Sequence, residues 1–251
     1  MKVVLLGSGT AIPVPDRGPA GLLLADGARS ILVDSGSGTV GRMAKAGVVP
    51  TTLERAFYTH FHPDHTADLV ALLFALRVGG RPGDPLVLHG PPGLAALVAR
   101  IGAAWFPWLQ PGEPPRWRVQ ELGPGRHAFP GFVAVAVKTD HTPDSQGYRF
   151  EFEGGPTVAV SGDTGPCDAL VDLGRGAAGL VLECSFPDEK AMAGHLTPSS
   201  CADVARRAAP RRLVLSHVYP ELDAIGEAVR RPFAGLPVEV ILGRDLLVVD
   251  A

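Results

Sequence analysis

Short aliphatic runs recur along the whole chain, and turns rich in glycine and proline separate them. Such runs are typical of strands that are buried on both faces, so the sheets they form need cover on both sides. The pattern predicts strands at residues 2–6, 22–25, 30–33, 55–59, 85–89, 133–137, 148–153, 157–161, 180–183, 213–216, 238–241 and 246–249.

Longer stretches with apolar residues at helical spacing lie between several of these strands. We expect helices at residues 40–46, 67–78, 94–105 and 198–208. The pair Gly154-Gly155 predicts a hairpin between two neighbouring strands, and a second hairpin is expected to join the last two strands. The Pro-rich segment from Trp105 to Trp117 is interpreted as a packed loop, with an apolar flap or a dimer contact as alternatives.

The composition is ordinary for a soluble chain, with 46% hydrophobic residues, 20% charged residues and a net charge of −3 over 251 residues. This balance argues against an extended nucleic-acid surface, which needs clustered lysine and arginine. Cys167, Cys184 and Cys201 are too few and too scattered for a disulfide framework, so we interpret them as reduced thiols. No signal peptide or membrane span is visible, so a cytoplasmic protein without membrane contact is expected.

The segment Thr59–His65 carries the strongest chemical signal in the sequence. His60, His62, Asp64 and His65 place three imidazoles and one carboxylate within six positions. The first two project to the same side of an extended segment, and the proline between the pairs turns the chain so that the others face them. Imidazole and carboxylate are ligands that zinc prefers, so this cluster predicts a metal site rather than a solvated His-rich loop.

Three further polar residues, His141, Asp163 and His217, each follow one of the predicted apolar strands. Loops at strand ends are where sites are commonly built. One such histidine alone would more often cap an element or lie on the surface, but their joint occurrence behind the first cluster indicates additional ligands. His89 and His127 match no ligand motif and are expected to be structural or exposed.

Taken together, these motifs resemble the metallo-β-lactamase fold superfamily and, within it, the ribonuclease Z-like branch, over nearly the whole chain. The His-x-His-x-Asp-His motif is specific to the superfamily. The branch is indicated by residues 6–10, 34–39, 147–149, 161–164, 182–186 and 194–197. The resemblance implies an α/β fold, a four-layer αββα sandwich, in a single domain over residues 1–251.

The resemblance also implies two divalent ions, each held by three side chains and bridged by one carboxylate. One ion would be held by His60, His62 and His141, the other by Asp64, His65 and His217, and Asp163 would bridge them. A hydroxide between two ions about 4 Å apart can attack a phosphoryl centre, and Asp64 could orient it. Zinc is expected from the ligand types, and manganese also suits this mixture.

Glu183 and His195 match a second pair of the branch, in which the histidine donates a proton to the leaving oxygen. A carboxylate beside an imidazole raises the pKa of that imidazole and fixes its tautomer. We therefore interpret Asp64, Glu183 and His195 as catalytic. The alternative is that Glu183 simply ends a strand and that His195 lies in a loop.

The sequence departs from ribonuclease Z in lacking the long arm that binds transfer RNA. In that branch the arm lies between the residues that match His141 and Asp163, which are only 22 positions apart here. A small phosphodiester is therefore the expected substrate: a cyclic nucleotide, a cyclic ribosyl phosphate or an RNA end. Members of the branch are often homodimers, so a homodimer is expected.

Three alternatives stay open. A lactonase or another ester or thioester hydrolase could use the same seven ligands, because a dinuclear site can also direct attack on a carbonyl carbon. Processing of transfer-RNA 3′ ends, despite the missing arm, is the second alternative. A degenerate RNA-binding or assembly subunit is disfavoured, because such members tend to lose ligands and all seven are present.

Overall fold

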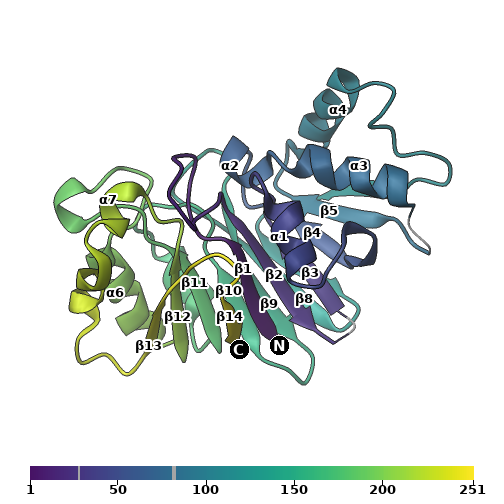
Figure 1. Ribbon diagram of the computed structural model, residues 1–251. Coiled ribbons are helices and arrows are strands. Elements are labelled where there is room, and N and C mark those ends of the chain that lie inside the picture. The colour runs from purple at the N-terminus through teal and green to yellow at the C-terminus, as the bar shows by residue number, and fades with distance from the viewer. Residues whose placement is uncertain (28, 81–82) are drawn as a thin grey trace.

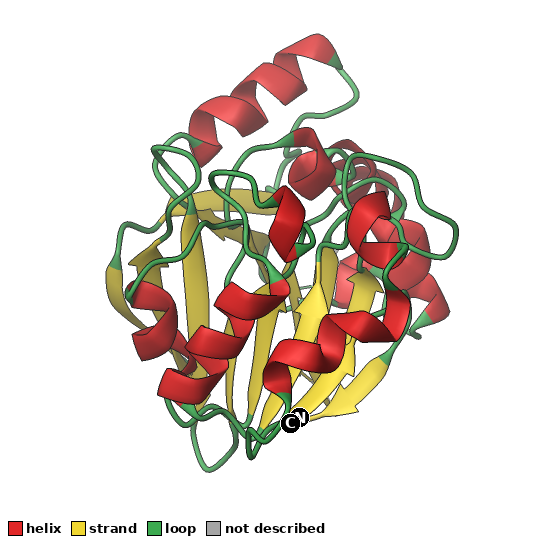
Figure 2. Cartoon of the chain, turned by 90° about the vertical axis from the view of Figure 1, so that its left-hand side faces the viewer, coloured by secondary structure: helices red, strands yellow, loops and turns green. Residues whose placement is uncertain are grey.

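The structure of the protein is a computed structural model that describes residues 1–27, 29–80 and 83–251. Within these residues two seven-stranded sheets face each other, and helices cover their outer faces (Figures 1 and 2). The predicted α/β architecture, a four-layer αββα sandwich, is confirmed. No helix in the described ranges is long and apolar enough to cross a membrane.

The first sheet has the order β14-β1-β2-β3-β4-β5-β6. Its strands are β1 (Lys2–Gly7), β2 (Gly21–Asp26), β3 (Arg29–Val33), β4 (Arg55–Phe57), β5 (Leu86–Gly90), β6 (Trp117–Glu121) and β14 (Val248–Asp250). Strands β3 to β6 run parallel to one another. Pairing of β1 with β14 brings the two ends of the chain together, as Figure 2 shows.

The second sheet has the order β13-β12-β11-β10-β9-β8-β7. Its strands are β7 (Gly125–Phe129), β8 (Phe132–Lys138), β9 (Gln146–Phe152), β10 (Thr157–Val160), β11 (Gly179–Glu183), β12 (Arg212–Ser216) and β13 (Glu239–Leu242). Strands β10 to β13 are parallel, and β9 is antiparallel to both of its neighbours. Strand β8 therefore points the same way as β10.

Apolar side chains pack in three layers, one between the sheets and one outside each sheet. Helices α1 (Thr39–Lys45) and α3 (Leu69–Gly79) cover the first sheet, and α5 (Ala169–Gly174) and α6 (Pro198–Ala208) cover the second. The remaining helices are α2 (Pro63–Thr66), α4 (Leu94–Ala104), α7 (Pro220–Asp223), η1 (Pro50–Thr52), η2 (Asp188–Lys190) and η3 (Gly226–Phe233). Burial of both faces explains why the strands read as continuous apolar runs.

The expected hairpin between the last two strands is wrong. Strand β13 pairs in parallel with β12, whereas β14 pairs with β1 in the other sheet. The connecting segment crosses between the sheets, where Leu247 O accepts a hydrogen bond from Leu5 N. Both strands are apolar, and apolar pattern alone does not say which sheet each strand completes.

Two other features differ from the prediction. The helix expected over residues 67–78 is present as α3, which begins at Leu69, and a separate short helix, α2, covers Pro63–Thr66 before it. Strands β6 and β7 were not predicted from the sequence. They carry many exposed positions, so they lack the apolar run that marks the other strands.

Candidate metal centre

The predicted ligands gather at one edge of the sandwich, where strands of both sheets end. His60 and His62 follow β4, Asp64 and His65 lie on α2, His141 follows β8, Asp163 follows β10 and His217 follows β12. In Figure 1 this edge, marked by α2, lies opposite the chain termini. Because these strands run the same way within each sheet, their carboxyl ends bring residues far apart in sequence to one place.

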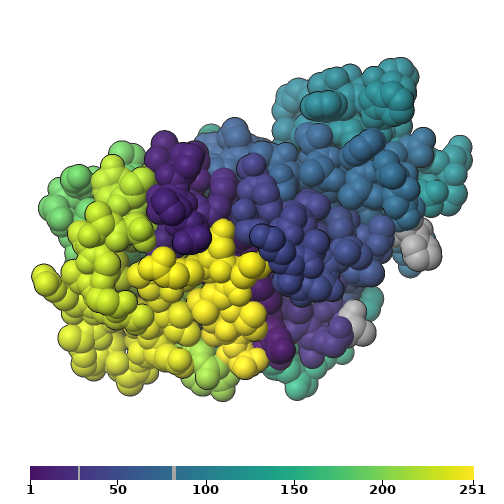
Figure 3. Space-filling view, in the orientation of Figure 1, coloured from purple at the N-terminus to yellow at the C-terminus, as the bar shows by residue number. Residues whose placement is uncertain are grey.

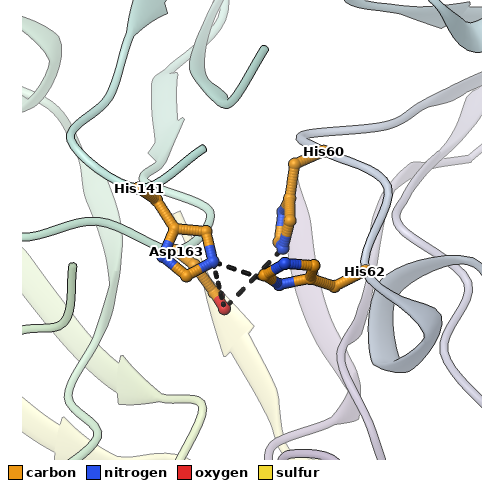
Figure 4. A group of neighbouring side chains, drawn as sticks. All are labelled: His60, His62, His141 and Asp163. Carbon is orange, nitrogen blue, oxygen red and sulfur yellow. Dashed lines mark hydrogen bonds and ion pairs between the residues drawn. The ribbon is translucent and has the colours of Figure 1, made fainter. Parts of the chain in front are cut away.

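The first group consists of His60, His62 and His141, arranged around the carboxylate of Asp163 (Figure 4). Nε2 of His60 lies 3.8 Å from Asp163 Oδ2, and Nε2 of His141 lies 3.7 Å from the same oxygen. Nε2 of His141 is also 3.1 Å from Nδ1 of His62. Three imidazole nitrogens therefore converge with one carboxylate oxygen.

The second group consists of Asp64, His65 and His217 on the other side of Asp163. Nε2 of His217 lies 3.4 Å from Asp64 Oδ2 and 3.3 Å from Asp163 Oδ2. Nε2 of His65 lies 3.2 Å from Asp163 Oδ1. Asp163 thus lies within 4 Å of histidines from both groups.

Unpaired buried atoms show that this donor set fits divalent cations. Nε2 of His60, Nε2 of His65 and Oδ1 of Asp163 are buried and have no hydrogen-bond partner among the described residues. Buried polar atoms without partners destabilise a fold by roughly 1–3 kcal/mol each. Imidazole and carboxylate donors that converge in this way match what zinc and similar cations require.

The opposite ring nitrogens of these histidines are held by the protein. Nδ1 of His65 lies 2.8 Å from Oδ2 of Asp34, and Nδ1 of His141 lies 3.0 Å from the carbonyl oxygen of Gly194. Nδ1 of His217 lies 3.1 Å from Oγ of Ser185. Such contacts fix the ring orientation and the tautomer, leaving Nε2 free for a cation.

Asp34 is the site residue that the sequence analysis missed as a functional position. It directly follows β3 and accepts hydrogen bonds from Thr59 N and Thr59 Oγ1, both at 2.8 Å. Its backbone has a φ of 59°, and His217 has a φ of 58°. Non-glycine residues rarely adopt this left-handed conformation. The available signal was an aspartate at the end of an apolar strand, as at Asp163.

The charges within the site favour a neutral His60 and a protonated His65 beside an ionised Asp163. Burial and the neighbouring His65 lower the pKa of His60 to about 2. Burial opposes ionisation of Asp163, but His217 and His65 outweigh it and hold the pKa of Asp163 well below its ordinary value. Burial would lower the pKa of His65, yet Asp163 and Asp34 raise it well above 6.5. A cation that binds Nε2 of His65 must therefore displace a proton.

Glu183 and His195 form a hydrogen-bonded pair beside these groups. Nδ1 of His195 lies 2.9 Å from Oε1 of Glu183, which also accepts from the backbone N–H of Thr164 at 2.8 Å. The second oxygen of Glu183 accepts from the Ser185 hydroxyl and from the Leu196 N–H. Burial lowers the pKa of His195, but the hydrogen bond and charge of Glu183 raise it overall. The pair therefore favours a protonated imidazole next to the centre.

An aromatic pair borders the same side of the site. Phe186 and Tyr219 are stacked, with ring centroids 4.5 Å apart and planes inclined by 24°. The ring of His195 lies 5.6 Å from that of Phe186 and 6.0 Å from that of Tyr219. Burial, followed by the carboxylates of Asp64, Asp163 and Glu183, raises the pKa of Tyr219. Sequence analysis did not single out Tyr219.

The two other histidines lie elsewhere. His89 is buried on β5, stacks on Phe57 with ring centroids 4.7 Å apart and has Nε2 3.2 Å from a guanidinium nitrogen of Arg55. Nε2 of His127 lies 2.8 Å from the carbonyl oxygen of Gly123. Among the residues that the structure describes, neither histidine belongs to a group of side chains that could hold a metal ion.

Comparison with known proteins identifies the family of the chain. A family model described as a beta-lactamase superfamily domain matches residues 29–218. A ribonuclease Z from Mycobacterium marinum is 33% identical over 271 residues, which cover 98% of this chain and 97% of that protein.

Two solved structures share the fold over their full length. The metallo-beta-lactamase fold protein YhfI from Bacillus subtilis has a TM-score of 0.83 and 22% identity, with 100% of this chain and 99% of that chain covered. Human tRNase Z, short form, has a TM-score of 0.79 and 25% identity, with coverage of 100% and 99%.

The chain therefore belongs to the beta-lactamase superfamily, as a metal-dependent hydrolase of the metallo-β-lactamase fold in its ribonuclease Z-like branch.

Proposed function

We propose that the protein is a phosphodiesterase that hydrolyses a small phosphodiester at this centre. The contact of 2.9 Å between His195 Nδ1 and Glu183 Oε1 carries the proposal, because it raises the pKa of His195 and so places a proton donor beside the cluster. Cleavage of a phosphodiester expels an alkoxide, which needs a proton as the bond breaks. Hydrolysis of an activated carbonyl compound depends less on such an acid.

We propose that the two groups of side chains hold two divalent ions, with Asp163 between them and zinc as the resident metal. Manganese is the alternative. Bound there, the ions would act as Lewis acids on the phosphoryl oxygens and lower the pKa of a water molecule. Asp64 would align that water, and its carboxylate is ionised for this role because the hydrogen bond with His217, against the effect of burial, lowers its pKa to about 2.

The short connection between His141 and Asp163 supports a small substrate. That stretch contains only β9, β10 and their turns, with no inserted arm. Transfer-RNA 3′ processing is the second candidate, because a relative of nearly equal length is named ribonuclease Z. Free cysteines are typical of proteins in a reducing compartment, so we propose that the protein acts on these substrates in the cytoplasm.

We further propose that two copies of the chain associate through α4. This helix has one charged residue, Arg100, and it stands out beyond α3 in Figure 3. Trp105, Phe106 and Trp108 beyond its end are 54%, 71% and 65% exposed. Exposed apolar surface of this kind marks an interaction site. A groove of about 670 Å³ lies between α3 and the two tryptophans. The same face therefore carries both a protruding helix and a groove. In a dimer with two-fold symmetry, the protruding part of each copy would fill the groove of the other.

The proposed function is tested by assaying zinc- and manganese-loaded protein in parallel with bis(p-nitrophenyl) phosphate, a lactone and a transfer-RNA precursor. Turnover of the phosphodiester that collapses in His65→Ala, without precursor cleavage, is the expected result. Lactone opening without phosphodiester turnover would overturn the proposal. Accurate cleavage of the precursor would show that the substrate is transfer RNA and not a small phosphodiester.

A further inference from the structure

Tyr219 is held firmly at the border of the metal centre. It immediately precedes α7, and its backbone N–H donates a hydrogen bond to the carbonyl oxygen of Ser185 at 3.3 Å. Its ring stacks on Phe186, which follows β11. Backbone and ring are thus anchored to the segment that also holds Glu183, so the position of the phenol is fixed relative to the site.

The phenol borders the reactive groups on two sides. Its ring lies 6.0 Å from that of His195 at 71°, and 5.8 Å from that of His217 at 72°. The tyrosine ring therefore lies next to both the proposed acid, His195, and a proposed metal ligand, His217.

The hydroxyl of Tyr219 differs from those of the other two tyrosines. Tyr58 Oη is hydrogen-bonded to Ser35 Oγ at 3.0 Å, and Tyr148 Oη donates to the Tyr58 carbonyl oxygen at 2.9 Å. Within the described chain Tyr219 Oη has no protein hydrogen-bond partner, and Tyr219 is only partly buried. A neutral O–H donor beside the site is thus available to a ligand.

We propose that Tyr219 Oη donates a hydrogen bond to a nonbridging oxygen of the phosphoryl group, which makes Tyr219 a further catalytic residue. This inference rests on the proposed function. Negative charge grows on the nonbridging oxygens as the attacking oxygen approaches phosphorus, and a fixed donor aimed at them stabilises the transition state. In the proposed reaction His195 donates a proton to the leaving oxygen, so the two donors act on different oxygens of one phosphoryl group.

Tyr219→Phe removes the hydroxyl and keeps the ring that stacks on Phe186. In the metal-loaded protein we expect the dissociation constant for inorganic phosphate, measured by calorimetry, to rise about 10-fold, as for the loss of one hydrogen bond to a charged group. The kcat should fall by a similar factor for bis(p-nitrophenyl) phosphate and for diphenyl phosphate, whose leaving group is poorer. His195→Ala, in contrast, should lose more with the poorer leaving group.

Tyr148→Phe is the matched control, because its hydroxyl is paired in the core. It should leave phosphate affinity unchanged, and Tyr219→Phe should keep the metal content and the Tm of the wild type. An unchanged phosphate affinity in Tyr219→Phe, or a rate loss confined to diphenyl phosphate, would overturn the proposal. So would a loss of metal, or an absence of phosphate binding by the wild type.

The phosphate titration separates this inference from the proposed function. If the wild type binds phosphate but hydrolyses no phosphodiester, the proposed reaction fails, and the ratio of the two dissociation constants still decides whether Tyr219 Oη contacts the anion. If the wild type hydrolyses phosphodiesters and Tyr219→Phe matches it in both measurements, only the role of Tyr219 fails.

Discussion

Asp34 and His65 form a hydrogen-bonded pair behind the metal centre, with 2.8 Å between Oδ2 and Nδ1. The pair directs Nε2 of His65 toward Asp163, at 3.2 Å. Because Asp34 also accepts two hydrogen bonds from Thr59, one carboxylate fixes both the start of the ligand segment and the orientation of a proposed ligand. The precision of the centre therefore depends on a residue that would not itself touch a metal.

Asp34→Asn should weaken metal binding while leaving the fold intact. The amide keeps the size of the side chain but removes the negative charge opposite Nδ1 of His65. Loss of such a partner typically costs about 10–100-fold in metal affinity. Competition with a coloured chelator measures the affinity, and the exposed Asp26, changed to Asn, is the control. Equal affinity in Asp34→Asn and wild type would contradict this role.

The pair formed by Glu183 and His195 predicts a particular pH profile. Glu183 raises the pKa of His195 against the effect of burial, and the protonated imidazole is the proposed donor. The rate should therefore fall as the pH rises through that pKa. In Glu183→Gln the pKa drops, so the fall should begin at lower pH. In His195→Ala the fall in rate at high pH should disappear, and kcat should be roughly 10²–10⁴-fold lower than in the wild type. The pH dependence of kcat/KM in the three proteins tests this, and superimposable profiles would refute it.

Removal of metal should destabilise the protein as well as inactivate it. Buried atoms of His60, His65 and Asp163 have no hydrogen-bond partner in the described protein, so removal of the metal would leave them without any partner. At a free zinc concentration 100-fold above its Kd, the stabilisation is about 2.7 kcal/mol. For a chain of this size that corresponds to a rise in Tm of roughly 5–10 °C. Scanning calorimetry with chelator and with zinc measures it; Asp163→Asn should show a much smaller rise.

The apolar surface around α4 predicts the oligomeric state. Light scattering should give a mass of twice the 26.2 kDa of one chain. Changing Trp105 and Trp108 together to Asp should give the monomer mass, because each charge would be placed in an apolar contact. Arg206→Glu on α6, at the opposite end of the molecule in Figure 1, is the control and should remain a dimer. A wild-type mass of 26.2 kDa would refute the dimer.

Local patterns predicted buried strands with cover on both sides and a metal site at residues 60–65, and the resemblance to the superfamily implied the four-layer sandwich and the full set of seven candidate ligands. Apolar runs mark buried strands, and a dense His and Asp motif at residues 60–65 has few other uses. Asp34 and Tyr219 were missed for a physical reason. Asp34 was used only as part of the motif at residues 34–39, and Tyr219 belongs to no motif. The importance of both comes from contacts across elements: Asp34 reaches His65 on α2, and Tyr219 borders His195.

The sheet membership of the last strands could not be predicted for a similar reason. β13 and β14 are both short and carry apolar residues, and the crossing between sheets depends on contacts with the beginning of the chain. Asp245 accepts hydrogen bonds from the backbone N–H groups of Ser8 and Gly18 at 2.9 Å and 2.8 Å. Contacts so distant in sequence leave no periodic signal.

Pairing of β1 with β14 also has a consequence for how the protein is made. β1 is synthesised before the other thirteen strands of the two sheets, and its outer neighbour, β14, is synthesised after them. A nascent chain that ends before residue 248 therefore exposes one edge of β1, with unpaired backbone groups that another strand could join. The first sheet is therefore completed only after β14 has been made, although its other six strands lie within the first 121 residues.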